Sequence, residues 1–135
     1  MASTPTFTKT IGSQITSLSN TNLTTVLTAD ATYARRITGI SVTSDDTSAQ
    51  TITLYISDAV TDMPVGAVSV AIGAGTVAGT LETGLIATFT TVFRERDATG
   101  LTILNLPATY LIKARLTALT GGKTFYVLVK YEKYD

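Results

Sequence analysis

Carboxylates are the side chains of this sequence best suited to acid–base catalysis near neutral pH. The chain contains no histidine and no cysteine, which excludes Ser–His triads, cysteine nucleophiles and Cys/His zinc sites. A pair of carboxylates could still hydrolyse a glycosidic bond. Most of the ten Asp and Glu residues, however, lie in turn-like stretches, where Asp hydrogen-bonds its own backbone. The sequence therefore predicts a protein that is not an enzyme.

Metal and cofactor sites have equally little support. Asp45, Asp46, Asp58 and Asp62 come closest to a calcium-type cluster, but no loop carries the alternating oxygen ligands of such a site. The glycine-rich stretch 73–79 lacks the Lys-Ser/Thr of a phosphate-binding loop. Solvated turns explain these residues better, and we expect no metal and no cofactor.

The charge balance argues against two classes of partner. Lys plus Arg and Asp plus Glu both number ten, so the formal net charge is zero. No long-range field would draw the protein onto nucleic acid or an anionic membrane, and no stretch is apolar enough to cross a bilayer. The first residues also lack the pattern of a secretory signal. We expect a soluble protein made in the cytoplasm that binds neither nucleic acid nor membrane.

The composition and the alternation of side chains favour β-strands. Threonine is the commonest residue, and β-branched side chains fit a pleated surface better than a helix. Residues 51–57 alternate cleanly, with Ile52, Leu54 and Ile56 on one face, after a dense polar turn and another alternating run at 34–43. This pattern predicts a β-hairpin, and residues 110–117 and 125–131 predict a second one around Gly121-Gly122.

The whole chain fits one domain of 135 residues. About seven or eight short strands with turns at regular intervals predict an all-β protein, an antiparallel β-sandwich. A jelly roll and an immunoglobulin-like sandwich both produce this alternation, so the pattern leaves the two open. Apolar residues at helical spacing between 80 and 93 favour one short helix that caps an end of the sandwich.

The N-terminal stretch differs from the remainder. Residues 1–22 are rich in Ser, Thr and Asn with thinly spaced apolar residues, which predicts an extended arm before a sandwich domain at 23–135. If the arm lies across a neighbouring protein, its apolar side chains are the expected contacts. These are Phe7, Ile11, Ile15 and Leu18.

Aromatic and basic residues complete the candidate interface. Three tyrosines near the C-terminus, Tyr126, Tyr131 and Tyr134, could anchor a protein interface or stack on sugars, although tyrosines on a strand face are often cross-strand pairs. Arg35 and Arg36 are too sparse for a basic stripe and are expected at a protein contact or a strand edge.

Several runs of the sequence resemble a known family. Residues 106–115 and 118–127, together with 40–44 and 50–55, are similar to small β-sandwich virion proteins of tailed bacteriophages that accompany the head. The resemblance runs from about residue 23 to the end. Thr109 stands where that pattern has a glycine, and residues 130–135 replace a glycine-rich ending.

This resemblance implies a capsid decoration, or cement, protein on the head surface of a virion. Such a protein would bridge neighbouring copies of the major capsid protein, and the resemblance favours a homotrimer. Two alternatives stay open: a neck or tail adaptor or collar subunit that contacts other virion proteins, and a carbohydrate-binding module of a fibre or surface protein.

Overall fold

The computed structural model describes residues 9–85, 94–96 and 102–134, and these residues form strands and loops without a helix. The all-β class predicted from the sequence is therefore confirmed. The strands are β1 (Lys9–Leu18), β2 (Thr24–Leu27), β3 (Arg35–Ser44), β4 (Gln50–Ser57), β5 (Asp62–Val70), β6 (Thr83–Gly84), β7 (Arg94–Arg96), β8 (Thr102–Leu106), β9 (Leu111–Leu116) and β10 (Phe125–Tyr134).

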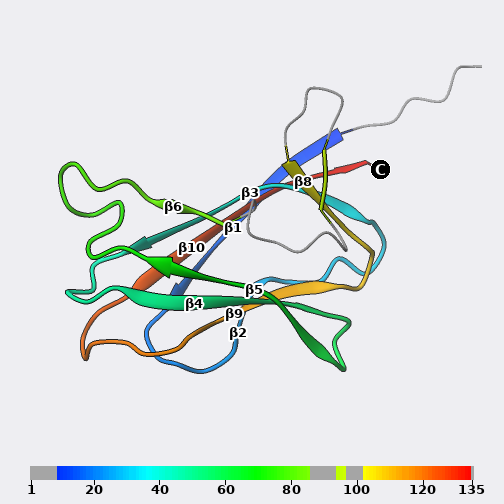
Figure 1. Cartoon of the computed structure of the whole chain (residues 1–135). Helices are drawn as coiled ribbons and strands as arrows, with labels where there is room; N and C mark the ends of the chain where they lie inside the picture. Colours follow the sequence, from blue (N-terminus) through cyan, green and yellow to red (C-terminus); the bar gives the residue numbers. More distant parts are fainter. Residues whose placement is uncertain (1–8, 86–93, 97–101, 135) are drawn as a thin grey trace, which may run out of the picture.

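The strands form two antiparallel sheets that pack face to face. Sheet A has the order β1-β10-β3-β8-β7, with β6 added beside β3, and sheet B has the order β2-β9-β4-β5. Figure 1 shows the two layers, with β4, β9 and β2 below β1, β10 and β3. The inward side chains of both sheets meet in one hydrophobic core, in which Phe125 is the largest fully buried side chain.

The order of pairing identifies the sandwich as a jelly roll. β1 pairs with β10, β2 with β9, β3 with β8, and β4 with β5. These pairs are nested, as they would be if one long two-stranded ribbon were rolled up on itself. The same nesting puts β1 and β10 in one sheet and β2 and β9 in the other, which is the double-sheet arrangement of a jelly roll and not that of an immunoglobulin domain.

Both predicted hairpins are wrong, although their strands exist. β3 belongs to sheet A and β4 to sheet B, and the same is true of β10 and β9. The polar turns at 45–49 and 117–124 therefore cross from one sheet to the other. The hairpin of this region is formed by β4 with β5, its next strand in the chain.

The described part of the predicted N-terminal arm, residues 9–22, contains a strand of the sandwich. Residues 9–18 are extended, as predicted, but every one of them pairs with β10 from Lys9↔Tyr134 to Leu18↔Phe125. The Oε1 atom of Gln14 also accepts hydrogen bonds from the N–H of Thr28 at 3.0 Å and from its hydroxyl at 3.2 Å. This contact joins β1 to the end of β2, so β1 belongs to the sandwich although it precedes residue 23.

Two further expectations are corrected by local geometry. Strict alternation along the run at 34–43 would place Ile37 and Ile40 on opposite faces, because their numbers differ by three, but a bulge beside Gly39 turns both into the core. The part of the predicted 80–93 helix that the structure describes, residues 80–85, contains the short strand β6 instead, with Leu85 buried and Leu81 exposed. Residues 86–93 lie outside the described part of the chain.

Candidate interaction surface

The outer face of β1 presents two isoleucines to solvent. Side chains alternate along a strand, so the odd-numbered residues of β1 point outward and the even-numbered ones inward. Ile11 and Ile15 are 73% and 70% exposed, whereas Leu18 is 2% exposed and packs in the core. The four predicted contacts of the arm are thereby divided: two lie at the surface, Leu18 is a core residue, and Phe7 lies outside the described residues.

The neighbouring strand β10 extends this apolar surface. Leu128 lies opposite Ile15 and Tyr126 opposite Ser17, so both side chains share the outer face of sheet A. Tyr126 is 49% exposed and Leu128 is half-buried. Tyr126 is among the aromatic residues predicted as contacts, whereas Leu128 was not predicted. Parity along 125–131 indicates that Leu128 also faces outward, because Phe125, Val127 and Val129 are all buried and alternate with Tyr126 and Leu128.

The loop between β5 and β6 borders this surface. A shallow groove of about 560 Å³ lies between the loop and the sheet and is lined by Ile15, Tyr126, Leu128 and Thr43 together with Gly75 and Glu82 of the loop. Gly75 has a positive φ of 73°, and a Cβ atom there would lie 2.7 Å from Cγ2 of Thr43. The glycine thus lets the loop approach the sheet. Three further apolar side chains of the loop are exposed: Ile72, Val77 and Leu81.

Arg35 and Tyr131 pack on each other at the end of the sandwich away from the β5–β6 loop (Figure 1). Arg35 is 5% exposed, and its Nη2 donates hydrogen bonds to the carbonyl oxygens of Thr28 at 2.8 Å and Tyr110 at 3.3 Å. Its guanidinium lies 5.2 Å from the centroid of the Tyr131 ring, and burial lowers the pKa of the guanidinium. Because Tyr131 is itself half-buried against the core, neither side chain offers the exposed contact that we predicted.

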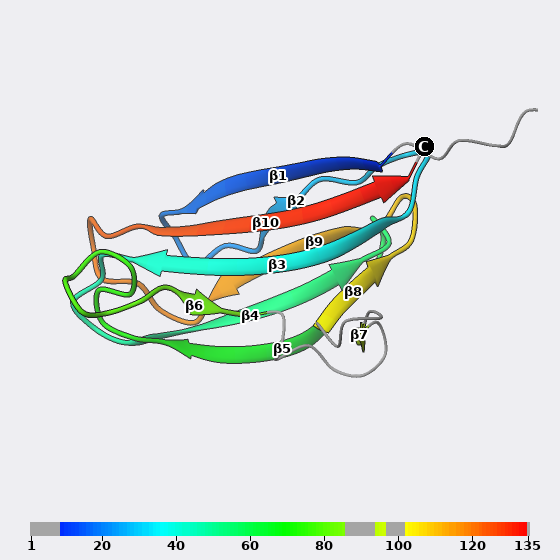
Figure 2. The same cartoon turned by 90° about the horizontal axis from the view of Figure 1, so that it is seen from above.

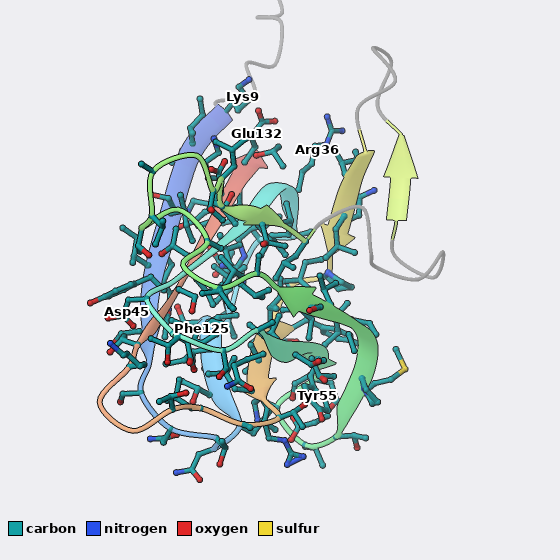
Figure 3. The ribbon with its side chains drawn as sticks, turned by 60° about the vertical axis from the view of Figure 1, so that its left-hand side comes forward. Lys9, Arg36, Asp45, Tyr55, Phe125 and Glu132 are labelled. Carbon is teal, nitrogen blue, oxygen red and sulfur yellow. The ribbon has the colours of Figure 1, made fainter. Side chains whose placement is uncertain are left out.

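The remaining predicted contacts are placed near this end. Arg36 points to the outer face beside β8 and is half-buried (Figure 3). Lys9 and Glu132, on adjacent strands, form an ion pair of 3.4 Å (Figure 3). The backbone of Tyr134 ends β10 opposite Lys9, and its side chain lies outside the described part of the structure.

The outer face of sheet B carries a second, more polar groove of about 440 Å³. Tyr55 of β4 and Arg115 of β9 lie on its wall, with the guanidinium 5.9 Å from the ring centroid. Three threonines and Leu116 line the rest, and Figure 3 shows Tyr55 at the far end of the molecule from Lys9. These threonines are Thr21, Thr53 and Thr117.

The aspartates stabilise turns and the segments that cross between the two sheets. Asp58 accepts hydrogen bonds from the N–H groups of Val60 and Thr61, which lower the pKa of its carboxyl. The pKa of Asp62 is lowered by a hydrogen bond from Ser57 and by Lys113, whose Nζ is 3.0 Å from its Oδ1. Among the described residues no group of three or more acidic side chains is arranged to hold a metal ion.

Asp46 is the most constrained of these carboxylates. It is 1% exposed and accepts hydrogen bonds from the N–H and the hydroxyl of Thr120, at 3.0 Å and 2.6 Å, and from Ser48 and Gln50. Burial raises the pKa of the carboxyl, but the four hydrogen bonds outweigh burial and lower it to about 2. The residue ties the 45–49 crossing to the 117–124 crossing.

The described part of the chain contains no helix that is both long and apolar enough to span a membrane. No family model, curated protein or solved structure matches the chain.

Proposed function

We propose that this protein is a non-enzymatic structural protein of a phage virion, a capsid decoration protein that binds the major capsid protein at the head surface. The resemblance of its strand and turn patterns to small head-associated virion proteins is the starting point. Its jelly-roll fold is compatible with that role, since jelly rolls occur in viral capsid proteins. The same fold also occurs in lectins, so the fold by itself does not choose between them.

The observation that carries the proposal is the exposed apolar face of sheet A. Ile11, Ile15 and Tyr126 are large side chains that lie on one face and are each about half exposed or more. Ile15, Tyr126 and Leu128 line one groove, and Ile11 lies further along β1, opposite Glu132. An exposed apolar patch that is bordered by polar residues is typical of a protein interaction site. Tyr126 adds an aromatic side chain, a residue type that is enriched at the centres of protein interfaces.

A modest contact is sufficient for such a protein. Many symmetric copies bind the assembled head and have no affinity for its unassembled state, so each copy stabilises the shell by mass action. The formal net charge of zero adds no long-range repulsion between copies that lie side by side. Heads that carry the protein should then resist heating better than heads that lack it.

The test compares binding of two variants to heads purified without the protein. Tyr126→Glu places a charge in the groove of sheet A, and Ser69→Glu places the same charge on the exposed outer face of sheet B. We expect Tyr126→Glu to weaken co-sedimentation with heads by about tenfold or more, because burying an unpaired charge costs more than 1.4 kcal/mol. Ser69→Glu should bind as the parent does. Equal binding of both variants, or a parent that ignores heads, would overturn the proposal.

A position in the neck or tail is the closest variant of this function. The same outer face would then contact an adaptor or collar protein. Counting copies per virion by quantitative mass spectrometry separates the two positions, since a decoration protein scales with the capsid protein and a ring subunit is present in six or twelve copies.

Sugar binding is the second candidate, and the groove on sheet B is the observation that favours it. Arg115 could pair with an acidic sugar, Tyr55 could stack on a pyranose ring, and threonine hydroxyls could hydrogen-bond it. The groove replaces Tyr131 and Tyr134 as the expected platform, because the ring of Tyr131 packs against the core and lies under the guanidinium of the buried Arg35. A glycan array that gives signal with the parent and none with Arg115→Ala would favour this function, and a blank array would exclude it.

A further inference from the structure

β1 ends sheet A, and no strand of the described residues pairs with its outer side. All ten residues of β1 pair with β10 in an unbroken register, so the strand is long and regular. Seen from above, β1 forms the outermost margin of one long side of the molecule (Figure 2). An edge of this kind presents a row of backbone N–H and C=O groups that can pair with another strand.

Among the described residues, four other strands lie at sheet edges and have features that discourage such pairing. β6 has only two residues. β2 has four residues and an irregular register. β5 begins with Asp62, contains Pro64 and is itself bulged at Val65. β7 consists of three charged residues. Short length, proline, bulges and charges are the usual means of protecting an edge, and β1 has only Lys9 at its first position.

The outward row of β1 is self-complementary. Ile11 and Ile15 lie two residues before and two residues after Ser13 on the same face. If two β1 strands pair antiparallel with Ser13 at the centre, Ile11 lies directly opposite the partner subunit's Ile15, and Ile15 opposite the partner subunit's Ile11. Lys9 then lies opposite the partner subunit's Ser17, so no two like charges face each other.

We propose that two copies of this chain associate through β1, antiparallel and centred on Ser13, so that their A sheets form one continuous sheet. The occupant of the edge is thus a second copy. Pairing covers the exposed backbone groups and places the two isoleucines, 73% and 70% exposed in one copy, beside those of the other copy on the same outer face. The proposal does not rest on the virion function. Because the pairing is two-fold, it predicts a mass of twice 14.2 kDa and not the trimer that the resemblance favours.

A single cysteine tests both the contact and its register, since the chain has no cysteine of its own. Directly opposed Cα atoms of an antiparallel pair are about 4.5–5.5 Å apart, which a disulfide can span. Under mild oxidation Ser13→Cys should form a covalent dimer on a non-reducing gel. Ser17→Cys is the matched control on the same face, and its two copies would lie about 27 Å apart in this register. Cross-linking of Ser17→Cys as fast as Ser13→Cys, or none of Ser13→Cys, would overturn the proposal.

Charged substitutions at position 13 test the same pairing of two β1 strands without a covalent bond. Ser13 is exposed, so Ser13→Glu and Ser13→Lys should fold as the parent does, with unchanged circular dichroism. Each variant alone should dimerise at least about tenfold more weakly, because like charges lie directly opposite each other. An equimolar mixture should recover the dimer in light scattering. A parent of one or three times 14.2 kDa, or variants with the mass of the parent, would contradict self-pairing and leave the edge to a strand of another protein.

Discussion

Gly12 of β1 makes room for the ring of Tyr131 on the adjacent strand β10. The two residues are paired in the register, and a Cβ atom on Gly12 would lie 2.7 Å from Cε2 of Tyr131 and closer still to Cζ and the hydroxyl oxygen. The guanidinium of Arg35 lies over the same ring. The glycine is therefore what allows a large aromatic side chain to fit between the edge strand and a buried cation.

Replacing this glycine should destabilise the fold. We expect Gly12→Ala to lower the free energy of unfolding by about 1–3 kcal/mol, the usual cost of overpacking, as measured by urea denaturation. Gly39→Ala is the matched control on β3, because its Cβ would meet only the flexible end of Lys130 at 3.5 Å. In a Tyr131→Ala background the cost of Gly12→Ala should fall. An equal cost in both backgrounds would show that the ring is not the cause.

Asp46 should be the acidic residue whose removal costs most. Asp46→Ala leaves the hydroxyl and N–H of Thr120 and the donors of Ser48 and Gln50 without their acceptor. We expect a loss of about 2–4 kcal/mol in the free energy of unfolding, since buried unsatisfied donors are costly. Thr120→Val removes only one of these donors and should cost less. A larger loss for Thr120→Val would contradict this assignment.

The same carboxylate predicts a dependence of stability on pH. Its pKa is about 2 in the folded protein against an ordinary value of 3.8. Because the folded-state pKa is depressed, its contribution to stability is present above the unfolded value and disappears as the pH falls from about 4 to about 2. Urea midpoints measured across this range should fall more steeply for the parent than for Asp46→Asn. Parallel curves would mean that another group causes the acid sensitivity.

Thr109 is strained by its backbone conformation. Its φ is 70°, in the left-handed region where a β-branched side chain is disfavoured, and its N–H donates to the carbonyl oxygen of Asp30 at 2.7 Å. Thr109→Gly keeps that hydrogen bond and should stabilise the fold by about 0.5–1 kcal/mol, because relief of strain exceeds the added entropy of the unfolded chain. Thr53→Gly, in the middle of β4, should instead destabilise. A loss of stability on Thr109→Gly would show that the threonine side chain makes a necessary contact.

The ion pair of Lys113 and Asp62 should contribute little to the free energy of unfolding. Both side chains are partly exposed, at 22% and 33%, on the outer face of sheet B. We expect Lys113→Met to change the free energy of unfolding by less than about 1 kcal/mol, and the difference to shrink in high salt. The measurement is urea denaturation at two salt concentrations. A salt-independent loss of several kcal/mol would mean that the stem of Lys113 packs on the sheet.

The faces of the strands follow from the sequence alone. Ile52, Leu54 and Ile56 alternate with threonine and tyrosine, and all three are buried as predicted. The alternation of Ile112 and Leu116 with Lys113 and Arg115 is confirmed in the same way. This information is local, because successive side chains of any strand point to opposite sides. The glycine expected in place of Thr109 also reflects a local property, its positive φ.

The partners of the strands were decided only by the tertiary structure. A polar turn between two alternating runs looks the same whether the chain folds back into one sheet or crosses to the other. The 45–49 segment crosses between the sheets, and there Asp46 accepts hydrogen bonds from Thr120, which is 74 residues away in the chain. The edge position of β1 depends likewise on pairing with β10, more than a hundred residues later in the chain. Local alternation determines which side chains face the core, whereas hydrogen bonds between distant segments determine which strands lie side by side and which edge remains open.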